Sequence, residues 1–246
     1  MPDTELYFIA GAWLLYLFDS GAALYADELL FATGLGGWHN VAGGGQLLFG
    51  RRVLLPNPLL PGARLLRICW SRASSVPANA ETSAATLEHV ETAAFRQALR
   101  PLQFGVGLLL VLIAVALPAL FHGYGPGLPL LLLVIAIYAL NLAMAAWLWH
   151  ARVRLGLGKR ACLLLTVDLL LCPPFAINLV RKIGLQQPLV GDPLSFAQSR
   201  FGAAPLRALC ALLARRLHGE IAAEEPGGAQ QQKLGALMER LEAMTP

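Results

Sequence analysis

Three strongly polar side chains interrupt the longest apolar stretches of the sequence, and they are best placed to do chemistry. They are Asp19, Asn141 and Asp168. A charged side chain within a membrane-spanning segment costs ~2.5–3.5 kcal/mol or more and usually marks a functional position. At a helical rise of about 1.5 Å per residue, all three fall roughly 10 Å from the same face of a bilayer core. We therefore expect one intramembrane polar cluster.

Two interpretations of this cluster stay open from the sequence. Asp19 and Asp168 have no Lys or Arg inside the same apolar stretches, which is typical of a proton or cation site. Alternatively, a protonated Asp168 bonds Asn141 and holds two helices together. Asp19 would then mark the end of a short first helix.

Other motifs that carry chemistry are absent from the sequence. The glycines at 156–158 lack P-loop spacing, and Glu88, His89 and Glu91 do not present the paired histidines of a zinc site. The four cysteines form no CxxC pair, so we expect them to pack as small apolar residues. The sequence predicts no cofactor, no metal and no catalytic residue, which makes enzymatic activity uncertain and favours a non-enzyme.

Arginines next to apolar residues indicate contact with anionic lipid headgroups. These arginines are Arg51, Arg52, Arg64, Arg67, Arg207, Arg215 and Arg216. Nucleic-acid binding is not expected, because it would need a basic patch with interleaved aromatic residues on a soluble fold. The sequence therefore predicts anionic membrane lipids as partners.

The composition explains why membrane segments are expected at all. Of 246 residues, 57% are hydrophobic and 14% are charged, with a formal net charge of +4. Soluble domains carry about 25% charged residues, so the chain has too few charges to cover a soluble surface. A surplus of basic residues in a membrane protein indicates loops that face the cytoplasm.

Four candidate spans follow from segments of about 20 apolar residues. Residues 102–121 and 128–149 are continuous spans, and residues 6–18 reach the required length if the helix continues through 21–25. Residues 161–180 contain Pro173 and Pro174, which break or kink a helix. That segment either crosses with a kink or re-enters, and the side of the following tail depends on which.

Charge predicts the orientation. The link at 152–160 is basic, and so is the loop at 26–101, whose arginines lie between 51 and 100, so both are expected in the cytoplasm of a bacterial-type inner membrane. The turn at 121–128 has no Lys or Arg and is expected outside, together with the acidic N-terminus. The first apolar segment is expected to be retained as an anchor rather than cleaved as a secretory signal.

The segments outside the spans are predicted to be mainly helical. Residues 46–55 suggest a short hairpin, 62–72 an interfacial helix, and 86–100 a helix leading into the second span. In the tail, a helix from Pro205 to Gly219 carries the leucine stripe, which we define as Leu206, Leu209, Leu213 and Leu217. A C-terminal seam at heptad spacing follows, made of Leu234, Leu237, Leu241 and Met244.

The sequence thus predicts an all-α integral membrane protein of three or four transmembrane helices with a helical tail. Its expected parts are residues 1–32 (anchor), 33–100 (cytoplasmic segment), 101–183 (spans) and 184–246 (tail). The leading functional hypothesis is a non-enzymatic accessory or scaffold subunit of a membrane assembly, bound to a membrane-protein partner through the seam. The alternatives are a small proton- or cation-coupled transporter using Asp19 and Asp168, and a membrane enzyme acting on lipid headgroups.

Overall fold

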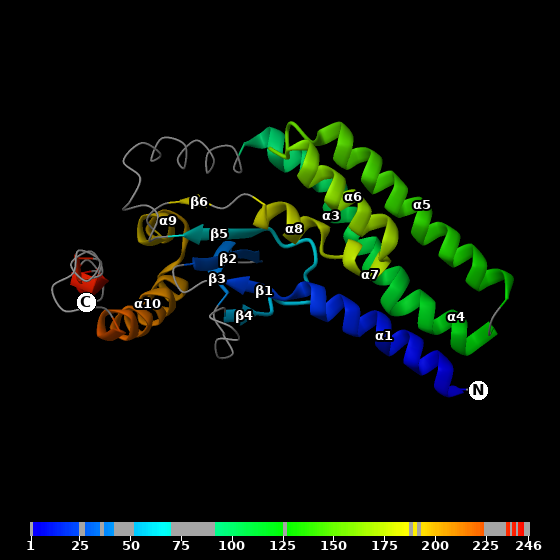
Figure 1. Ribbon diagram of the computed structural model, residues 1–246, viewed down its shortest axis with the longest axis horizontal. Coiled ribbons are helices and arrows are strands. Elements are labelled where there is room, and N and C mark those ends of the chain that lie inside the picture. Colours follow the sequence, from blue (N-terminus) through cyan, green and yellow to red (C-terminus); the bar gives the residue numbers. More distant parts are fainter. Residues whose placement is uncertain are drawn as a thin grey trace.

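The protein is elongated, with a helical bundle at one end and a small sheet covered by helices at the other (Figure 1). The computed structural model describes residues 2–24, 28–34, 37–41, 52–69, 92–124, 127–186, 189–190, 193–223, 235–236, 238–239 and 241–243. The N-terminus lies at the far end of the bundle, and the C-terminus lies beyond the sheet.

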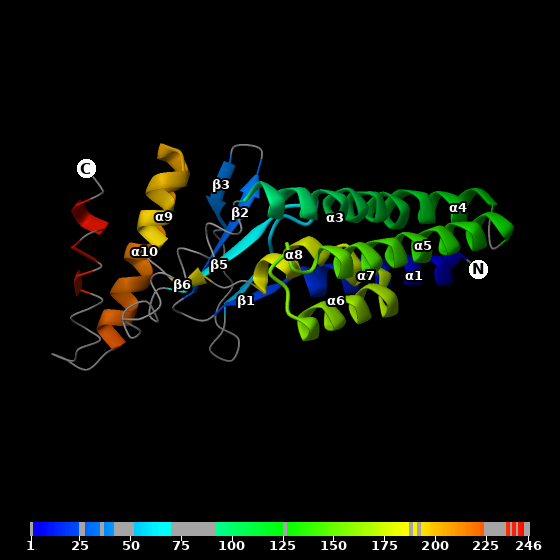
Figure 2. The same ribbon diagram turned by 90° about the horizontal axis from the view of Figure 1, so that it is seen from above.

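Long helices lie side by side in the bundle (Figure 2). The helix α1 covers Pro2–Ser20, and α3 covers Ala93–Val111. Through the π-helical η2 (Leu112–Ala116), α3 continues into α4 (Leu117–Tyr124), and α5 (Leu128–Ala151) runs back beside it. The stretch Ala93–Gly123 and α5 are both long and apolar enough to cross a membrane. The π-helical turn ends two residues before Pro118, which lacks an N–H and crowds the carbonyl of the preceding turn.

The next segment reverses direction within the bundle. The helix α6 covers Lys159–Leu171 and ends at Cys172, which is extended because residues before proline disfavour helical dihedrals. The short α7 (Pro173–Ala176) and α8 (Leu179–Leu185) then lead back toward the sheet (Figure 2). This segment therefore begins and ends at the same end of the bundle, which is the geometry of the re-entrant alternative.

A four-stranded sheet in the order β3-β2-β5-β6 and a two-stranded ribbon, β1-β4, form the other end. The strands are β1 (Ala22–Leu24), β2 (Glu28–Gly34), β3 (Gly37–Asn40), β4 (Arg52–Leu54), β5 (Leu65–Cys69) and β6 (Leu189–Val190). All pairings are antiparallel except β5 with β6. Phe31 lies opposite Leu66 and Ala32 lies opposite Leu65, so successive residues face opposite sides of the sheet.

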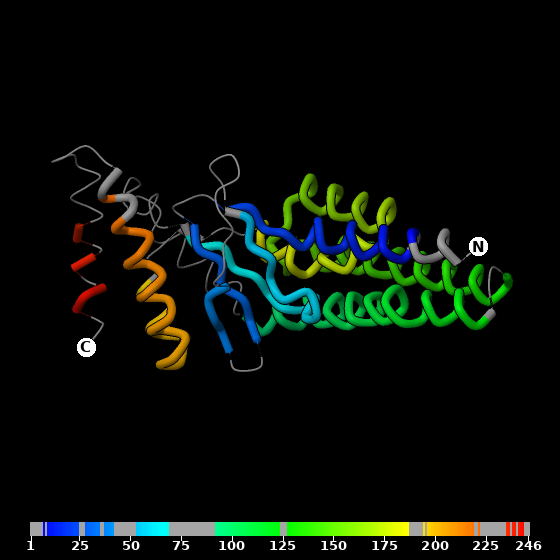
Figure 3. The backbone as a smooth tube through the Cα atoms, turned by 90° about the horizontal axis from the view of Figure 1, so that it is seen from below, coloured from blue at the N-terminus to red at the C-terminus, as the bar shows by residue number. Residues whose placement is uncertain are grey.

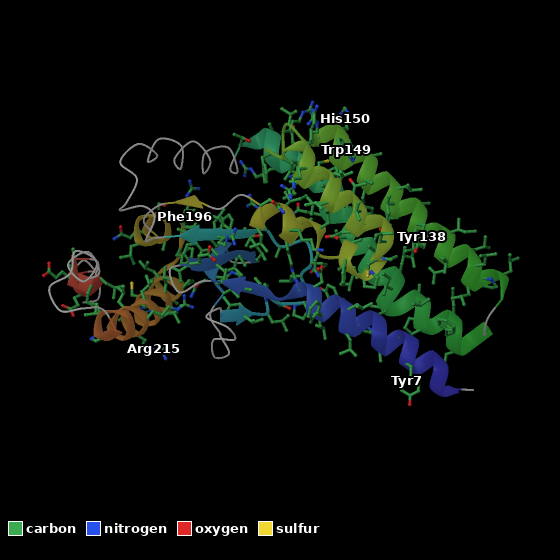
Figure 4. The ribbon with its side chains drawn as sticks, viewed as in Figure 1. Tyr7, Tyr138, Trp149, His150, Phe196 and Arg215 are labelled. Atoms are coloured by element: carbon green, nitrogen blue, oxygen red, sulfur yellow. The ribbon has the colours of Figure 1, made fainter. Side chains whose placement is uncertain are left out.

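Helices cover both faces of this sheet. Helix α8 packs on β5, where a Cβ at Gly184 would clash with the Leu65 carbonyl oxygen. Two further helices, α9 (Pro193–Arg200) and α10 (Ala203–Ala223), cover the other face (Figure 3). Phe196 of α9 stacks on Phe31 with ring centroids 5.4 Å apart (Figure 4).

The prediction that the fold is all-α is wrong, because two small sheets stand beside the helices. The interfacial helix predicted over 62–72 is also wrong, since Leu65–Cys69 form β5 in the middle of the sheet. The strand was not recognised because β2 and β5 bury side chains on both faces of the sheet. Leu29 and Leu30 are both buried, and so are Leu65 and Leu66, so the strands lack the alternation that identifies a half-buried strand.

Two other predicted boundaries changed. The first helix does not continue through 21–25, because α1 ends at Ser20 and β1 begins at Ala22. A hairpin was predicted over residues 46–55. In the structure, Leu54 of β4 pairs with Ala22 of β1, and residues 42–51 lie outside the described residues. The predicted start of the helix over 86–100 also lies outside them, and α3 begins at Ala93.

Candidate functional site: a lysine held by two aspartates

The ends of three helices bring oppositely charged groups together, and we call the group the Lys182 cluster: Asp19, Asp168, Asn178 and Lys182. The Lys182 ammonium lies 2.9 Å from an Asp19 carboxylate oxygen and 2.8 Å from one of Asp168. It also lies 5.1 Å from the centre of the Phe175 ring, within reach of a cation–π interaction. The side chains of Lys182 and Asp19 are 19% and 15% exposed, whereas that of Asp168 is 43% exposed. The cluster is therefore shielded on the Asp19 side and open on the Asp168 side.

Asn178 connects this cluster to the end of α1. Its amide nitrogen donates to an Asp19 carboxylate oxygen at 3.0 Å and to the Tyr16 carbonyl at 3.3 Å. Its amide oxygen accepts from Arg181 at 3.1 Å and lies 3.1 Å from the Ser20 hydroxyl. All the hydrogen-bonding capacity of this buried amide is used, so Asn178 orients the Asp19 carboxylate toward Lys182.

A second cation, which is buried, lies at the sheet end of the bundle. Arg181 is 2% exposed and donates to the carbonyls of Asn57 and Leu60 in the loop between β4 and β5. Tyr16 donates to the Pro58 carbonyl, and Gln103 donates to that of Gly62 at 2.8 Å. These hydrogen bonds are partly buried, and a carbonyl shielded from water needs a donor, because leaving it unpaired costs about as much as a lost hydrogen bond. The helices thereby hold the loop against the bundle.

The structure brings together two of the three predicted cluster residues. Asp19 and Asp168 share Lys182, but through that lysine rather than through Asn141. Asn141 is fully buried on α5, and neither polar atom of its side chain has a hydrogen-bond partner among the residues that the structure describes. The predicted bond between Asp168 and Asn141 is therefore absent from the described contacts.

Sequence reasoning missed Lys182 and Arg181 at this site, whereas it named Asn178 as a residue that joins the polar cluster if residues 161–180 fold back, and Asn178 does contact Asp19. A signal for the cations was present, because Arg181 and Lys182 would lie on the wrong side of the membrane if residues 161–180 crossed it. A segment that reverses at Pro173 removes this conflict and returns Lys182 to the level of Asp168, fourteen positions earlier in the chain.

The chemistry that this arrangement supports is electrostatic. Two carboxylates and the cations of Lys182 and Arg181 give a formally neutral set, joined by Asn178. A metal or transported cation would have to displace the ammonium that both aspartates already hold. The cluster thus joins α1, α6 and α8 near the sheet, as an ionic contact between three helices.

The arginines predicted to contact headgroups fall into three environments. Arg216 is buried under α10 and donates to the Glu28 carbonyl, and Arg67 pairs with the Glu28 carboxylate at 3.7 Å. Arg207 and Arg215 are exposed on α10, with Arg215 pointing away from the protein (Figure 4). For Arg216 the structure thus gives an internal role in place of the predicted surface role. Arg51 and the side chain of Arg52 lie outside the described residues.

Arg64 has an environment of its own. Its guanidinium lies 5.2 Å from the centre of the Trp38 ring, and its side chain lines a cavity beside the first turns of α3. Arginines from α3 also line that cavity. The predicted contact of Arg64 with lipid headgroups is therefore compatible with its surroundings.

Residues of the leucine stripe and of the seam pack against other parts of the same chain. Leu209, Leu213 and Leu217 are fully buried in the cluster that joins α10 to the sheet. This packing covers the face that was predicted to need a membrane or a partner. Leu241 of the seam is buried in the same cluster, whereas Leu234, Leu237 and Met244 lie outside the described residues.

These observations define a class by structure: a mostly helical protein with two apolar helices of membrane-spanning length and a small, helix-covered sheet. Comparisons of the chain with protein family models, with curated proteins and with solved structures gave no match.

Proposed function

We propose that the chain is a membrane-embedded, non-enzymatic accessory or scaffold subunit. The observation that carries the membrane part is that α5 is apolar on its outer side as well as on its buried side. A surface helix of a soluble protein would present polar residues there. The exposed residues of α5 include Leu131, Leu132, Val134, Ile135, Tyr138 and Leu142, and Figure 4 shows Tyr138 pointing outward.

Neighbouring helices support the same proposal. Phe104 and Val115 are exposed along the α3–α4 helix, Phe18 on α1, and Leu163 and Leu171 on α6. Large apolar side chains are thus exposed on all the long helices of the bundle, whereas contiguous exposed apolar patches are limited in size on soluble monomers. In a bilayer these side chains would face lipid tails, which removes the energetic penalty of their exposure to water.

The proposed topology has α3–α4 and α5 as full spans, α1 as a third, and α6–α8 as a re-entrant hairpin. The support is that the N-terminus and the turn between α4 and α5 lie at one end of the bundle, while the basic link at 152–160 lies at the other (Figure 1). With the hairpin re-entrant, the sheet, α9 and α10 fall on the side of the basic link. The positive-inside rule makes that side the cytoplasm of an inner membrane.

The scaffold part of the proposal is supported by the ion pairs and hydrogen bonds in and around the Lys182 cluster. Both of its carboxylates pair with Lys182, Arg181 balances the remaining charge through Asn178, and Arg181 also ties the helices to the loop that leads into the sheet. A rigid connection between a membrane bundle and a cytoplasmic sheet region suits a subunit that positions other proteins. The transporter alternative would need Asp19 and Asp168 to release Lys182 during each cycle.

Site-directed labelling tests the topology. Single cysteines at Gly125 and Gly156, in an otherwise cysteine-free background, are expected to react with an impermeant maleimide from opposite sides of the membrane. A third cysteine at Gln186, after α8, should label from the same side as the one at Gly156. Labelling at Gln186 from the Gly125 side would contradict the re-entrant hairpin, and release of the protein by alkaline carbonate would contradict embedding itself.

Purification in a mild detergent tests the scaffold role. The full chain is expected to retain a second membrane protein in a fixed ratio. Charge reversal at the exposed Arg207 and Arg215 probes whether α10 contributes, with Arg154→Glu on the α5–α6 link as the matched control. Recovery of the chain alone, as a monodisperse species from native membranes, would contradict the scaffold proposal.

A further inference from the structure

The first turns of α3 lie beside the sheet (Figure 2). A cavity of about 390 Å³ is lined by residues from both. Its polar and charged wall comes from Thr33 of β2, Arg64 before β5, and four side chains of α3. Those four are Arg96, Gln97, Arg100 and Gln103, and Ala93 and Leu99 complete the wall. The cavity thus combines three guanidinium groups with amide and hydroxyl groups.

The charge of this wall has one sign. None of the lining residues is acidic, and no ion pair within the described part of the chain involves Arg96 or Arg100. Guanidinium groups bind phosphate with two parallel hydrogen bonds, and amide and hydroxyl donors complete the shell of a tetrahedral anion. The lining also contains no histidine, cysteine or carboxylate, which favours binding over hydrolysis.

The cavity lies at a specific level of the bundle. Arg96 and Arg100 precede Leu102, where the apolar run begins, by about 9 Å and 3 Å at a rise of 1.5 Å per residue. The headgroup layer of a bilayer is roughly 5–8 Å thick on each side, so both arginines fall within or next to it. Independently, the indole nitrogen of Trp147 on α5 donates to the Ala98 carbonyl at 2.8 Å. Tryptophan prefers this interfacial level.

The cavity is also fixed in shape. The main-chain nitrogen of Arg64 donates to the Thr33 hydroxyl at 2.9 Å, and Gln103 holds the Gly62 carbonyl. Thr92 caps α3 by accepting from the nitrogen of Phe95. The three arginines therefore come from two elements that are joined by hydrogen bonds, which limits the cost of ordering them around a ligand.

We propose that this cavity binds a phosphate group, and that the group belongs to an anionic lipid headgroup rather than to a soluble phosphate ester. The lipid source rests on the proposed membrane embedding, whereas the phosphate chemistry rests on the wall alone. The site deepens the proposed function, because a bound headgroup would fix the sheet region against the membrane surface.

The test uses the full-length protein in a nonionic detergent. Binding of dioctanoyl phosphatidylglycerol is measured by calorimetry, with dioctanoyl phosphatidylcholine and glycerol 3-phosphate as comparison probes. Saturable one-to-one binding of phosphatidylglycerol is expected, with weaker binding of both comparison probes. Each arginine near an anionic surface contributes about fivefold in affinity, so Arg96→Gln with Arg100→Gln is expected to lower the affinity about thirtyfold.

Two further variants separate the cavity from general surface charge. Gln97→Glu places a carboxylate in the wall and is expected to weaken binding while all three arginines remain. Arg154→Gln with Lys159→Gln removes the same amount of charge from the exposed α5–α6 link and the start of α6, and should leave the affinity unchanged. Equal losses in this control and in the arginine pair would overturn the proposed cavity site.

The remaining outcomes distinguish the ligand source from the topology. Binding of glycerol 3-phosphate as tight as that of the lipid would overturn the lipid assignment. Undiminished lipid binding by the Arg96 and Arg100 double variant would overturn the site altogether. Carbonate extraction of each variant from membranes reports embedding separately, so failure of that proposal is visible without any lipid measurement.

Discussion

Replacement of Lys182 by glutamine should destabilise the bundle, and the result should depend on Asp19. In the structure, both aspartates lie within 2.9 Å of the same ammonium nitrogen. Two carboxylate oxygens that close to one nitrogen are less than about 6 Å apart, so without the lysine they repel each other. Glutamine keeps a similar length and some hydrogen-bonding capacity but removes the charge.

The magnitude follows from burial. Removal of one partner from a fully buried ion pair costs about 3–5 kcal/mol, because a charge is left without compensation. Here Asp168 is 43% exposed, which lets water screen that half of the cluster. We therefore expect Lys182→Gln to cost about 2–3 kcal/mol. For a chain of this size, that lowers the melting temperature by roughly 4–12 °C.

The assay is thermal unfolding in detergent of the full-length protein, with Lys159→Gln as the control. Lys159 is exposed at the start of α6, and its replacement should change stability by less than about 0.5 kcal/mol. Asp19→Asn alone should be destabilising because it removes one ion pair. In the Lys182→Gln background the same change should be stabilising, because it removes one of two unpaired carboxylates.

The reversal of sign is the decisive result. If Asp19→Asn destabilises equally in both backgrounds, Asp19 does not act through Lys182, and the described ion cluster is not what joins the helices. If Lys182→Gln leaves the melting temperature unchanged, the two aspartates do not destabilise the fold when the lysine is absent. That outcome would return them to the transporter hypothesis.

Three other substitutions or measurements test the packing. Gly184→Ala should lower the free energy of chemical unfolding by about 3 kcal/mol, because the new Cβ would clash with the backbone of Leu65. Gly107→Ala is the control: its Cβ would meet nothing within 4 Å, so it should be neutral or stabilising. Asn141→Leu should stabilise the protein by roughly 1–3 kcal/mol in the same assay, and a loss of stability would instead reveal a polar partner for Asn141. Burial raises the pKa of the Cys210 thiol. In a variant that keeps only this cysteine, alkylation of the folded protein should therefore require a higher pH than alkylation in denaturant. Equal pH profiles in the two states would contradict the burial of Cys210.

Part of the site could be predicted from the sequence. A carboxylate in an apolar stretch is expensive, so Asp19 and Asp168 stand out as residues that need a partner. Helical rise alone places them at one depth. Nothing local predicts that the partner is Lys182, because it depends on how the chain turns after Cys172.

The sheet could not be predicted for a related reason. A strand is recognised in a sequence when one face is buried and the other is wet. Strands β2 and β5 are covered by α8 on one face and by α9 and α10 on the other, so consecutive residues such as Leu29 and Leu30, or Leu65 and Leu66, are all buried and apolar. The arginines at 64 and 67 then resemble the basic edge of an interfacial helix.

By itself, the sequence determined the long apolar helices, because a run of some 20 residues without charge has few other stable conformations. The break at Pro173 is likewise local, since proline lacks an N–H and crowds the preceding turn. The tertiary structure decided which charges meet. Lys182 reaches Asp19 only because α8 returns beside α1, and Arg64 joins Arg96 and Arg100 only because the loop before β5 packs on α3. Contacts between residues distant in the chain depend on the packing of whole elements, and that packing is a property of the folded molecule.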